Sequence, residues 1–163
     1  ALVGDVRGAL GRTGLPPEAL TLELTESVLL DAGRSTMGAL RALRGDGVGI
    51  AIDDFGTGYA SLRYLAELPV TSVKIDMSFT RGLPSDPVCT SIVRAVSTLA
   101  ADLEISCVVE GVETADQLAA LPAGVHAQGF LLGRPTLPAG VLHLLTAMEP
   151  SVHTSSVPTT PRP

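Results

Sequence analysis

Carboxylate and amide side chains recur at or near the ends of short apolar segments in this sequence. The segment GIAIDD ends in Asp53 and Asp54, and three other segments place polar residues in comparable positions: Glu23 in LTLELTE, Glu110 in ISCVVEG and Gln128 in HAQGFLL. Oxygen ligands of this kind, without cysteine among them, favour Mg²⁺, Mn²⁺ or Ca²⁺ over zinc or copper. These residue types predict a site for hard divalent cations, provided that the segments end at one edge of a sheet.

A lysine joins this set in the segment SVKID, which contains Lys74 and Asp76. A carboxylate placed between two cations about 3.5 to 4 Å apart is a common device for phosphodiester hydrolysis. Asp53 and Asp54 would point to opposite faces inside a strand, but both can turn toward one site where the strand ends. Lys74 would then orient an attacking water or stabilise negative charge on a phosphoryl group.

Each of these residues taken alone has a simpler explanation. A single acid at a strand end commonly caps a helix or a turn. Glu26 would then only begin a helix, Lys74 would be a solvated charge, and Gln128 would be a turn amide. The joint placement of the polar residues at the ends of five segments favours a shared site.

Short apolar segments alternate along the chain with stretches of helical periodicity. The expected strands are residues 20–26, 49–54, 72–76, 105–111 and 126–132, and the expected helices are residues 36–44, 59–68 and 87–103. This alternation predicts a parallel sheet, either doubly wound or closed into a (β/α) barrel, with ligands at the carboxyl ends of the strands. Strand alternation places Glu23, Asp53 and Lys74 on one face and aliphatic residues on the other. Thr114 and Gln117 have the spacing of a capping box.

Composition limits the partners and the compartment. The 163 residues are 45% hydrophobic, which is enough for one domain with a core, and the net charge of −6 with no basic cluster argues against a nucleic-acid polymer or an anionic membrane as partner. Cys89 and Cys107 belong to no metal or disulfide motif, which favours a reducing cytoplasm. No apolar run approaches the ~18 residues of a membrane span. We expect the Pro/Ser/Thr-rich residues 149–163 to form a disordered tail.

Five longer motifs resemble those of one known family. LTLELTES, AIDDFGTGYASLRYL, VTSVKID, VVEGVET and QGFLLGRP occur in the order and approximate spacing found in EAL domains, from about Gly11 to Leu145. EAL domains are bacterial phosphodiesterases that hydrolyse cyclic di-GMP to linear pGpG, so the resemblance implies this activity. It also implies an α/β fold consisting of the C-terminal five βα units of a TIM-type (β/α)8 barrel, with the N-terminal strands missing. Residues 1–148 would form this partial EAL domain.

The resemblance further implies a role for each polar residue. The ligands of two Mg²⁺ or Mn²⁺ ions would be Glu23, Asp53 as the bridge, Asp54 and Glu110. The catalytic side chains would be Lys74, Glu110 and Gln128, and Gln128 would also bind the substrate. Supporting positions would be Glu26, which anchors the DDFGTGYASL loop, Asp76 beside Lys74, and Glu113 in an outer layer.

The resemblance also implies partners and a location. The ligand would be cyclic di-GMP, and the chain would form a homodimer. An upstream sensor or GGDEF domain would belong to the full protein. The location would be cytoplasmic, including the cytoplasmic part of a membrane-anchored sensor.

Two metal ligands of the family are absent from the sequence. The Glu of an early E-x-L-x-R stretch and an Asn at the end of the next strand have no counterpart, and the chain starts at Ala1 rather than at methionine. We therefore expect a piece of a longer protein, with an incomplete two-metal site and little or no activity by itself. The alternative is a catalytically degenerate EAL module that acts as a cyclic di-GMP receptor or a protein-interaction domain. A third hypothesis, from the pattern alone, is a self-contained five-stranded α/β fold with an acidic metal-binding crevice.

Overall fold

The computed structural model describes most of the chain. The described residues are 2–25, 28, 34–57, 68–138 and 140–141. They belong to two compact units, Ala1–Gly133 and Arg134–Pro163, and the sheet and the candidate site lie in the first. In the second unit, residues 138, 140 and 141 are helical. Four predictions lie wholly or partly outside the described residues: Glu26, residues 58–62 of the DDFGTGYASL loop, all but the last residue of the helix 59–68, and the tail 149–163.

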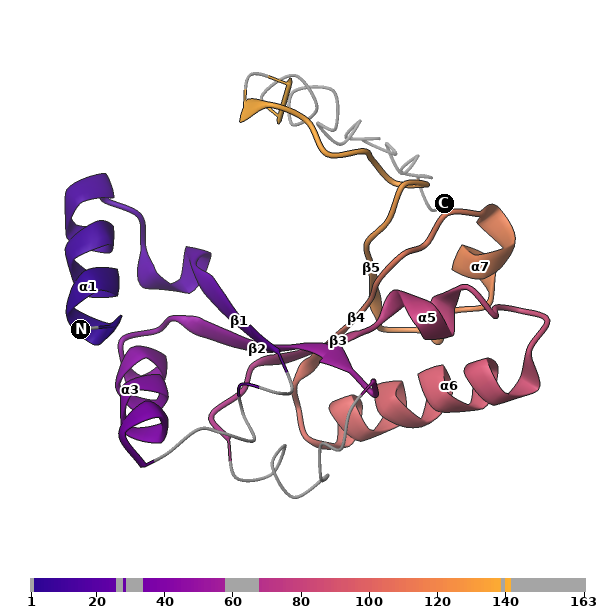
Figure 1. Ribbon diagram of the computed structural model, residues 1–163, viewed down its shortest axis with the longest axis horizontal. Coiled ribbons are helices and arrows are strands. Elements are labelled where there is room, and N and C mark those ends of the chain that lie inside the picture. Colours follow the sequence, from indigo (N-terminus) through magenta and orange to yellow (C-terminus); the bar gives the residue numbers. More distant parts are fainter. Residues whose placement is uncertain (1, 26–27, 29–33, 58–67, 139, 142–163) are drawn as a thin grey trace, which may run out of the picture. The chain divides into compact units, whose positions relative to one another are not determined.

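Strands and helices alternate along the first unit (Figure 1). The elements in chain order are α1 (Leu2–Thr13), the 3₁₀ helix η1 (Pro17–Ala19), β1 (Thr21–Thr25), α3 (Arg34–Gly45), β2 (Gly49–Phe55), β3 (Ser72–Ile75), α5 (Met77–Thr80), α6 (Pro87–Asp102), β4 (Ser106–Val109), α7 (Ala115–Ala119) and β5 (His126–Ala127). The five strands form one sheet in the order β1-β2-β3-β4-β5, and every neighbouring pair is parallel. The predicted parallel sheet is therefore confirmed.

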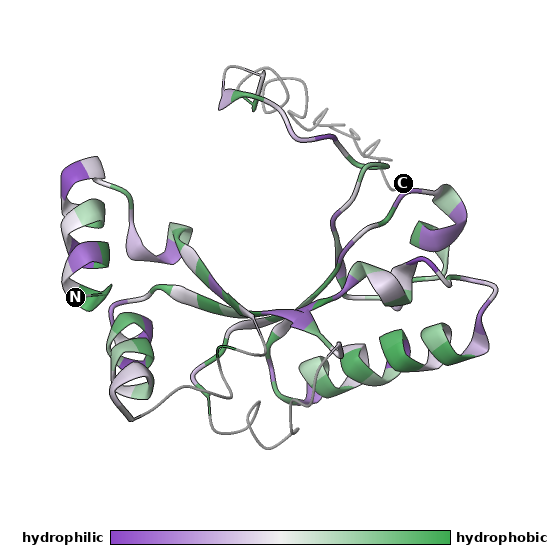
Figure 2. Ribbon diagram, viewed as in Figure 1, coloured by the Kyte–Doolittle hydropathy of each residue, from purple (hydrophilic) through white to green (hydrophobic). Residues whose placement is uncertain are grey.

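The core lies between the sheet and the helices α3 and α6, which are on the same side of the sheet in Figure 1. Alternate residues of the inner strands point into it: Ile50 and Ile52 of β2, Val73 and Ile75 of β3, and Cys107 and Val109 of β4. The helices contribute Leu40 of α3 and Val93 and Ala100 of α6. Figure 2 shows the mostly hydrophobic colouring of α6. Because a one-residue slip would expose this whole face, burial also sets the strand register.

The last strand is shorter than the sequence pattern predicts. Residues 126–132 are all expected in a strand, but only His126 and Ala127 pair with β4. The chain turns at Gly129, which lies against the backbone of Val112 so closely that a side chain there would collide with it. Leu131 N donates to Val112 O at 3.0 Å after this turn. The apolar residues that suggested a strand therefore belong to a turn packed on the preceding loop.

Candidate active site

Polar side chains occupy the face of the sheet opposite to α3 and α6. Glu23 of β1 pairs with Ala51 of β2, two residues before Asp53, and alternation continues through β3 to Lys74. Glu110 directly follows β4, and its backbone N–H donates to Ile75 O at 3.1 Å. The structure thus confirms the predicted alternation and brings these strand ends together.

Lys74 lies at the centre of the acids. Its Nζ donates a hydrogen bond to Glu23 Oε2 at 2.9 Å and forms ion pairs with Asp53 Oδ1 at 3.0 Å and Glu110 Oε1 at 2.7 Å. The side chain of Lys74 is 9% exposed, compared with 23% for Asp53, 18% for Glu110 and 49% for Glu23. One largely buried ammonium therefore holds three carboxylates, which come from β1, from β2 and from the residue after β4.

Two opposing effects act on the pKa of Lys74. Burial by itself lowers it, because the ammonium loses its water. The contacts with Glu110, Glu23 and Asp53 outweigh this effect and raise the pKa above its ordinary value of 10.5. A raised lysine pKa stabilises the fold at all pH values below the ordinary pKa, and this stabilisation is lost only as the pH rises through the raised value. Lys74 is therefore charged at neutral pH.

Asp54 reaches the same site although it directly follows Asp53. The pairing of β2 with β3 is irregular between Ile52 and Phe55, and Asp54 has a φ of 54°, in the left-handed region. Carboxylate oxygens of Asp53, Asp54 and Glu110 all lie within 4.8 Å of one another. The prediction that both aspartates turn to one site is confirmed, but the cause is a kink inside the strand, which continues to Phe55. We call Glu23, Asp53, Asp54 and Glu110 the acidic cluster.

One oxygen of the acidic cluster has no hydrogen-bond donor. Asp53 Oδ1 is buried and accepts no hydrogen bond from any described residue, since the Lys74 ammonium 3.0 Å away lies outside hydrogen-bond geometry. The Lys74 ammonium meets this oxygen as an ion pair, but a carboxylate oxygen has two lone pairs and can accept a second cation as well. Oxygens of Asp54 and Glu110 are close enough to share such a cation. The all-oxygen donor set therefore fits a hard divalent cation such as Mg²⁺ or Mn²⁺.

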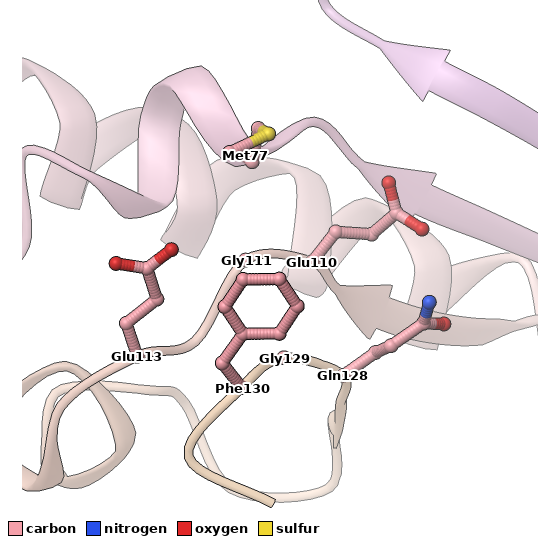
Figure 3. Close-up of a pocket in the computed structure, with 7 residues that line it drawn as sticks. All are labelled: Met77, Glu110, Gly111, Glu113, Gln128, Gly129 and Phe130. Carbon is pink, nitrogen blue, oxygen red and sulfur yellow. The ribbon is translucent and has the colours of Figure 1, made fainter. Parts of the chain in front are cut away.

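A pocket of about 230 Å³ adjoins the acidic cluster (Figure 3). Its lining comes from the ends of three elements: Met77 at the start of α5, Glu110, Gly111 and Glu113 after β4, and Gln128, Gly129 and Phe130 after β5. Glu110 belongs both to this pocket and to the acidic cluster. The structure thus places the predicted residues Glu113 and Gln128 at the pocket, next to the candidate cation site rather than inside it.

Asp76, predicted beside Lys74, caps a helix. Its side chain is the N-cap of α5, where Oδ1 accepts from Ser78 N at 3.0 Å. Hydrogen bonding by Ser78 lowers the pKa of Asp76 below the ordinary 3.8. The carboxylate therefore supports the turn that leads from Lys74 into α5.

We expect Asp76→Ala to lower the free energy of unfolding by about 1 kcal/mol at neutral pH, because α5 loses its cap. A lowered carboxyl pKa gives stability that is complete above the ordinary pKa and is lost as the pH falls through the lowered value, so the difference should shrink only in acid. Urea unfolding across pH measures this, with Asp76→Ser as the control that keeps a capping oxygen. Equal stability of Asp76→Ala and the wild type at pH 7 would contradict the assignment.

Several residues at the site had no functional signal in the sequence. Met77 and Phe130 line the pocket, but isolated apolar residues do not stand out from those of a core. Gly111 has a φ of 70°, and the sequence alone does not show which glycines adopt such a conformation. Gln117 was predicted with Thr114 as a capping box, and the structure confirms that box. The additional hydrogen bond of Gln117 to Thr80 depends on the tertiary fold and could not be predicted.

A family model described as EAL domain matches residues 1–135. The chain belongs to the EAL domain family. Among its relatives, the cyclic di-GMP phosphodiesterase PA2567 of Pseudomonas aeruginosa is 47% identical over 122 residues, which are 74% of this chain and 21% of that protein. MucR of the same organism, a bifunctional diguanylate cyclase/cyclic di-GMP phosphodiesterase, is 46% identical over 136 residues, or 82% of this chain and 20% of MucR. The EAL chain thus spans about a fifth of these relatives' length.

Solved EAL structures share the fold. The MucR phosphodiesterase in complex with cyclic di-GMP matches with a TM-score of 0.80 at 44% identity, covering 86% of this chain and 57% of that one. BlrP1 of Klebsiella pneumoniae with manganese and cyclic di-GMP matches with a TM-score of 0.76 at 35% identity, covering 82% of this chain and 34% of that one. EAL domains are TIM barrels, so the five-stranded sheet is part of a TIM-type barrel, as predicted. No helix among the described residues is long and apolar enough to cross a membrane.

Proposed function

We propose that this EAL domain hydrolyses cyclic di-GMP to linear pGpG with the help of Mg²⁺ or Mn²⁺. The observation that carries the proposal is the acidic cluster around Lys74, in which carboxylate oxygens of Asp53, Asp54 and Glu110 converge. The names of PA2567 and MucR support the substrate, and the manganese complex of BlrP1 supports a divalent cation.

Lys74 must change partners before it can meet a substrate. Three carboxylates surround the ammonium at 2.7 to 3.0 Å, so their oxygens occupy the space next to it. Lys74 can therefore donate to a water or a phosphate oxygen only when one of these contacts is released. Glu23 is the half-exposed partner, so it exchanges its contact for water at the least cost. The freed donor would then stabilise negative charge at the reacting phosphoryl group.

Glu110 belongs to both the acidic cluster and the pocket, and Gln128 lines the pocket. A phosphodiester bound at the acidic cluster would therefore extend past these two residues into the pocket. Gln128 is exposed, and its side-chain amide can donate to a phosphate oxygen without first breaking a hydrogen bond to another described residue. The rest of a nucleotide would occupy the pocket lined by Met77 and Phe130. Divalent cations held by the acidic cluster would supply activation of water and neutralisation of phosphoryl charge.

The wider predictions follow from the same proposal. MucR combines a diguanylate cyclase with a phosphodiesterase, and this chain matches 20% of it, which supports an upstream cyclase domain of the GGDEF type. The predicted homodimer, the upstream sensor and the cytoplasmic location stay predictions. We further propose that the 163 residues alone turn over little substrate, because β1 and β5 each have one edge that no described strand pairs.

The test is an assay of the protein at the length its gene encodes, with cyclic di-GMP as substrate and chromatography of the product. We expect linear pGpG with Mn²⁺ or Mg²⁺ and no product in EDTA, and much slower turnover by the 163-residue chain assayed in parallel. Binding of cyclic di-GMP without turnover in either metal would contradict the enzyme and favour the degenerate receptor. Absence of both binding and turnover would exclude both functions.

A further inference from the structure

Gln117 makes more contacts than the capping of α7 requires. A capping box needs two reciprocal bonds, and Gln117 forms both with Thr114: Oε1 accepts from Thr114 N at 3.0 Å, and Gln117 N donates to Thr114 Oγ1 at 3.2 Å. The same Oε1 also accepts from Glu113 N at 2.8 Å. In addition, Nε2 donates to Thr80 O at 3.2 Å, across 37 residues of sequence.

The bond to Thr80 joins two segments that follow neighbouring strands. Thr80 ends α5, which comes after β3, whereas Gln117 holds the loop that comes after β4. Gln117 is 7% exposed and Thr80 is fully buried. Because water cannot readily replace a bond at this depth, its loss would leave the Gln117 amide unpaired.

A second contact presses the same loop onto the start of α5. Gly111 has a φ of 70°, and a Cβ added to it would lie 2.5 Å from Met77 Cβ. The loop is thus held at both ends of α5, by packing at Met77 and by the hydrogen bond at Thr80. Met77, Gly111 and Glu113 are also three of the pocket-lining residues in Figure 3.

The presence of glutamine rather than glutamate at position 117 is explained by the hydrogen bond to Thr80 and not by the capping of α7. Glu serves equally well at this position of a capping box. Its carboxylate could accept from the backbone of Glu113 and Thr114, but it has no hydrogen to donate to Thr80 O. An amide is therefore needed only for the bond to Thr80.

We propose that Gln117 is a positioning residue that sets the shape of the pocket beside Glu110, and thereby the affinity for cyclic di-GMP. The proposal rests on the proposed function, which assigns this pocket to the substrate. Gln117 does not line the pocket itself and acts through Glu113 and Thr80. Its loss should therefore weaken substrate binding while leaving the acidic cluster and the chemical step in place.

Gln117→Glu separates the hydrogen bond to Thr80 from the capping of α7. It keeps the oxygen that accepts from Glu113 N and Thr114 N, and it removes the N–H that donates to Thr80 O. In the gene-length protein with Mn²⁺, we expect the KM for cyclic di-GMP to rise about tenfold, the equivalent of one hydrogen bond, with kcat within about twofold. The Kd of cyclic di-GMP measured in EDTA should rise by a similar factor. If Gln117→Glu does not fold, Gln117→Met removes the same donor without a buried charge and must raise the Kd as well.

Thr114→Ala is the matched control. It removes the hydroxyl that caps α7 and leaves both ends of the Gln117 amide in place, so we expect the Tm to fall by about 3 °C with KM unchanged. An unchanged KM and Kd in the folded Gln117 variant, or an equal rise in Thr114→Ala, would overturn the inference. A wild type that neither binds nor hydrolyses cyclic di-GMP would overturn the proposed function first, so the two failures are distinct.

Discussion

Asp53→Asn should lower kcat for cyclic di-GMP by at least about a thousandfold, the scale at which a central charge of a metal-dependent site acts. Asp53 Oδ1 is buried and forms an ion pair with Lys74, and a carboxylate oxygen of Asp53 lies within 4.8 Å of oxygens of Asp54 and Glu110. Asparagine has nearly the same shape but no negative charge. The loss would therefore be chemical, with little change in packing.

The measurement is initial-rate hydrolysis at saturating substrate and excess Mn²⁺, with Asp116→Asn as the control. Asp116 is an exposed acid on α7, outside the acidic cluster, so the same change of charge there should leave kcat within about twofold. Turnover at the wild-type rate by Asp53→Asn would remove the acidic cluster from the mechanism.

Lys74→Met should lower the free energy of unfolding in EDTA by about 2 to 3 kcal/mol. The substitution leaves Asp53 and Glu110 largely buried without a cation. Glu23 is half-exposed and can regain water, so the expected cost is below that of a fully buried ion pair. The side-chain volume is nearly kept, and the change is therefore electrostatic.

Urea unfolding in EDTA and in Mn²⁺ measures this effect. Since the ammonium and a divalent cation would share the same carboxylates, Mn²⁺ should stabilise Lys74→Met more than it stabilises the wild type. Lys74→Arg keeps the positive charge and should lose less stability in EDTA. If Lys74→Met and the wild type unfold at the same urea concentration in EDTA, the ion pairs do not hold the site together.

The polar face of the sheet could be predicted because it depends on strand alternation alone. Glu23, Asp53 and Lys74 lie at positions of one parity in segments whose other residues are aliphatic, and burial of the aliphatic side determines where the polar side points. The parallel order of the strands follows from the helical stretches between them. No contact between distant residues was needed for either inference.

The parts that could not be predicted depend on local backbone geometry and tertiary contacts. The convergence of Asp53 and Asp54 was predicted, but its cause was not, because the kink with positive φ lies inside β2 and no period-two pattern contains it. The end of β5 is determined by close packing of Gly129 on Val112, which replaces strand pairing with a turn. The sequence reveals only the local role of Gln117 in the capping box, because its other partner, Thr80, is 37 residues away.

Titration of the gene-length protein with Mn²⁺, followed by calorimetry, tests most directly whether the acidic cluster is a divalent-cation site. We predict saturable Mn²⁺ binding by the wild type and affinity at least about a hundredfold weaker in Asp53→Asn. Asp116→Asn should bind Mn²⁺ as the wild type does. Equal Mn²⁺ affinity in Asp53→Asn and the wild type, or no saturable binding by the wild type, would contradict the account.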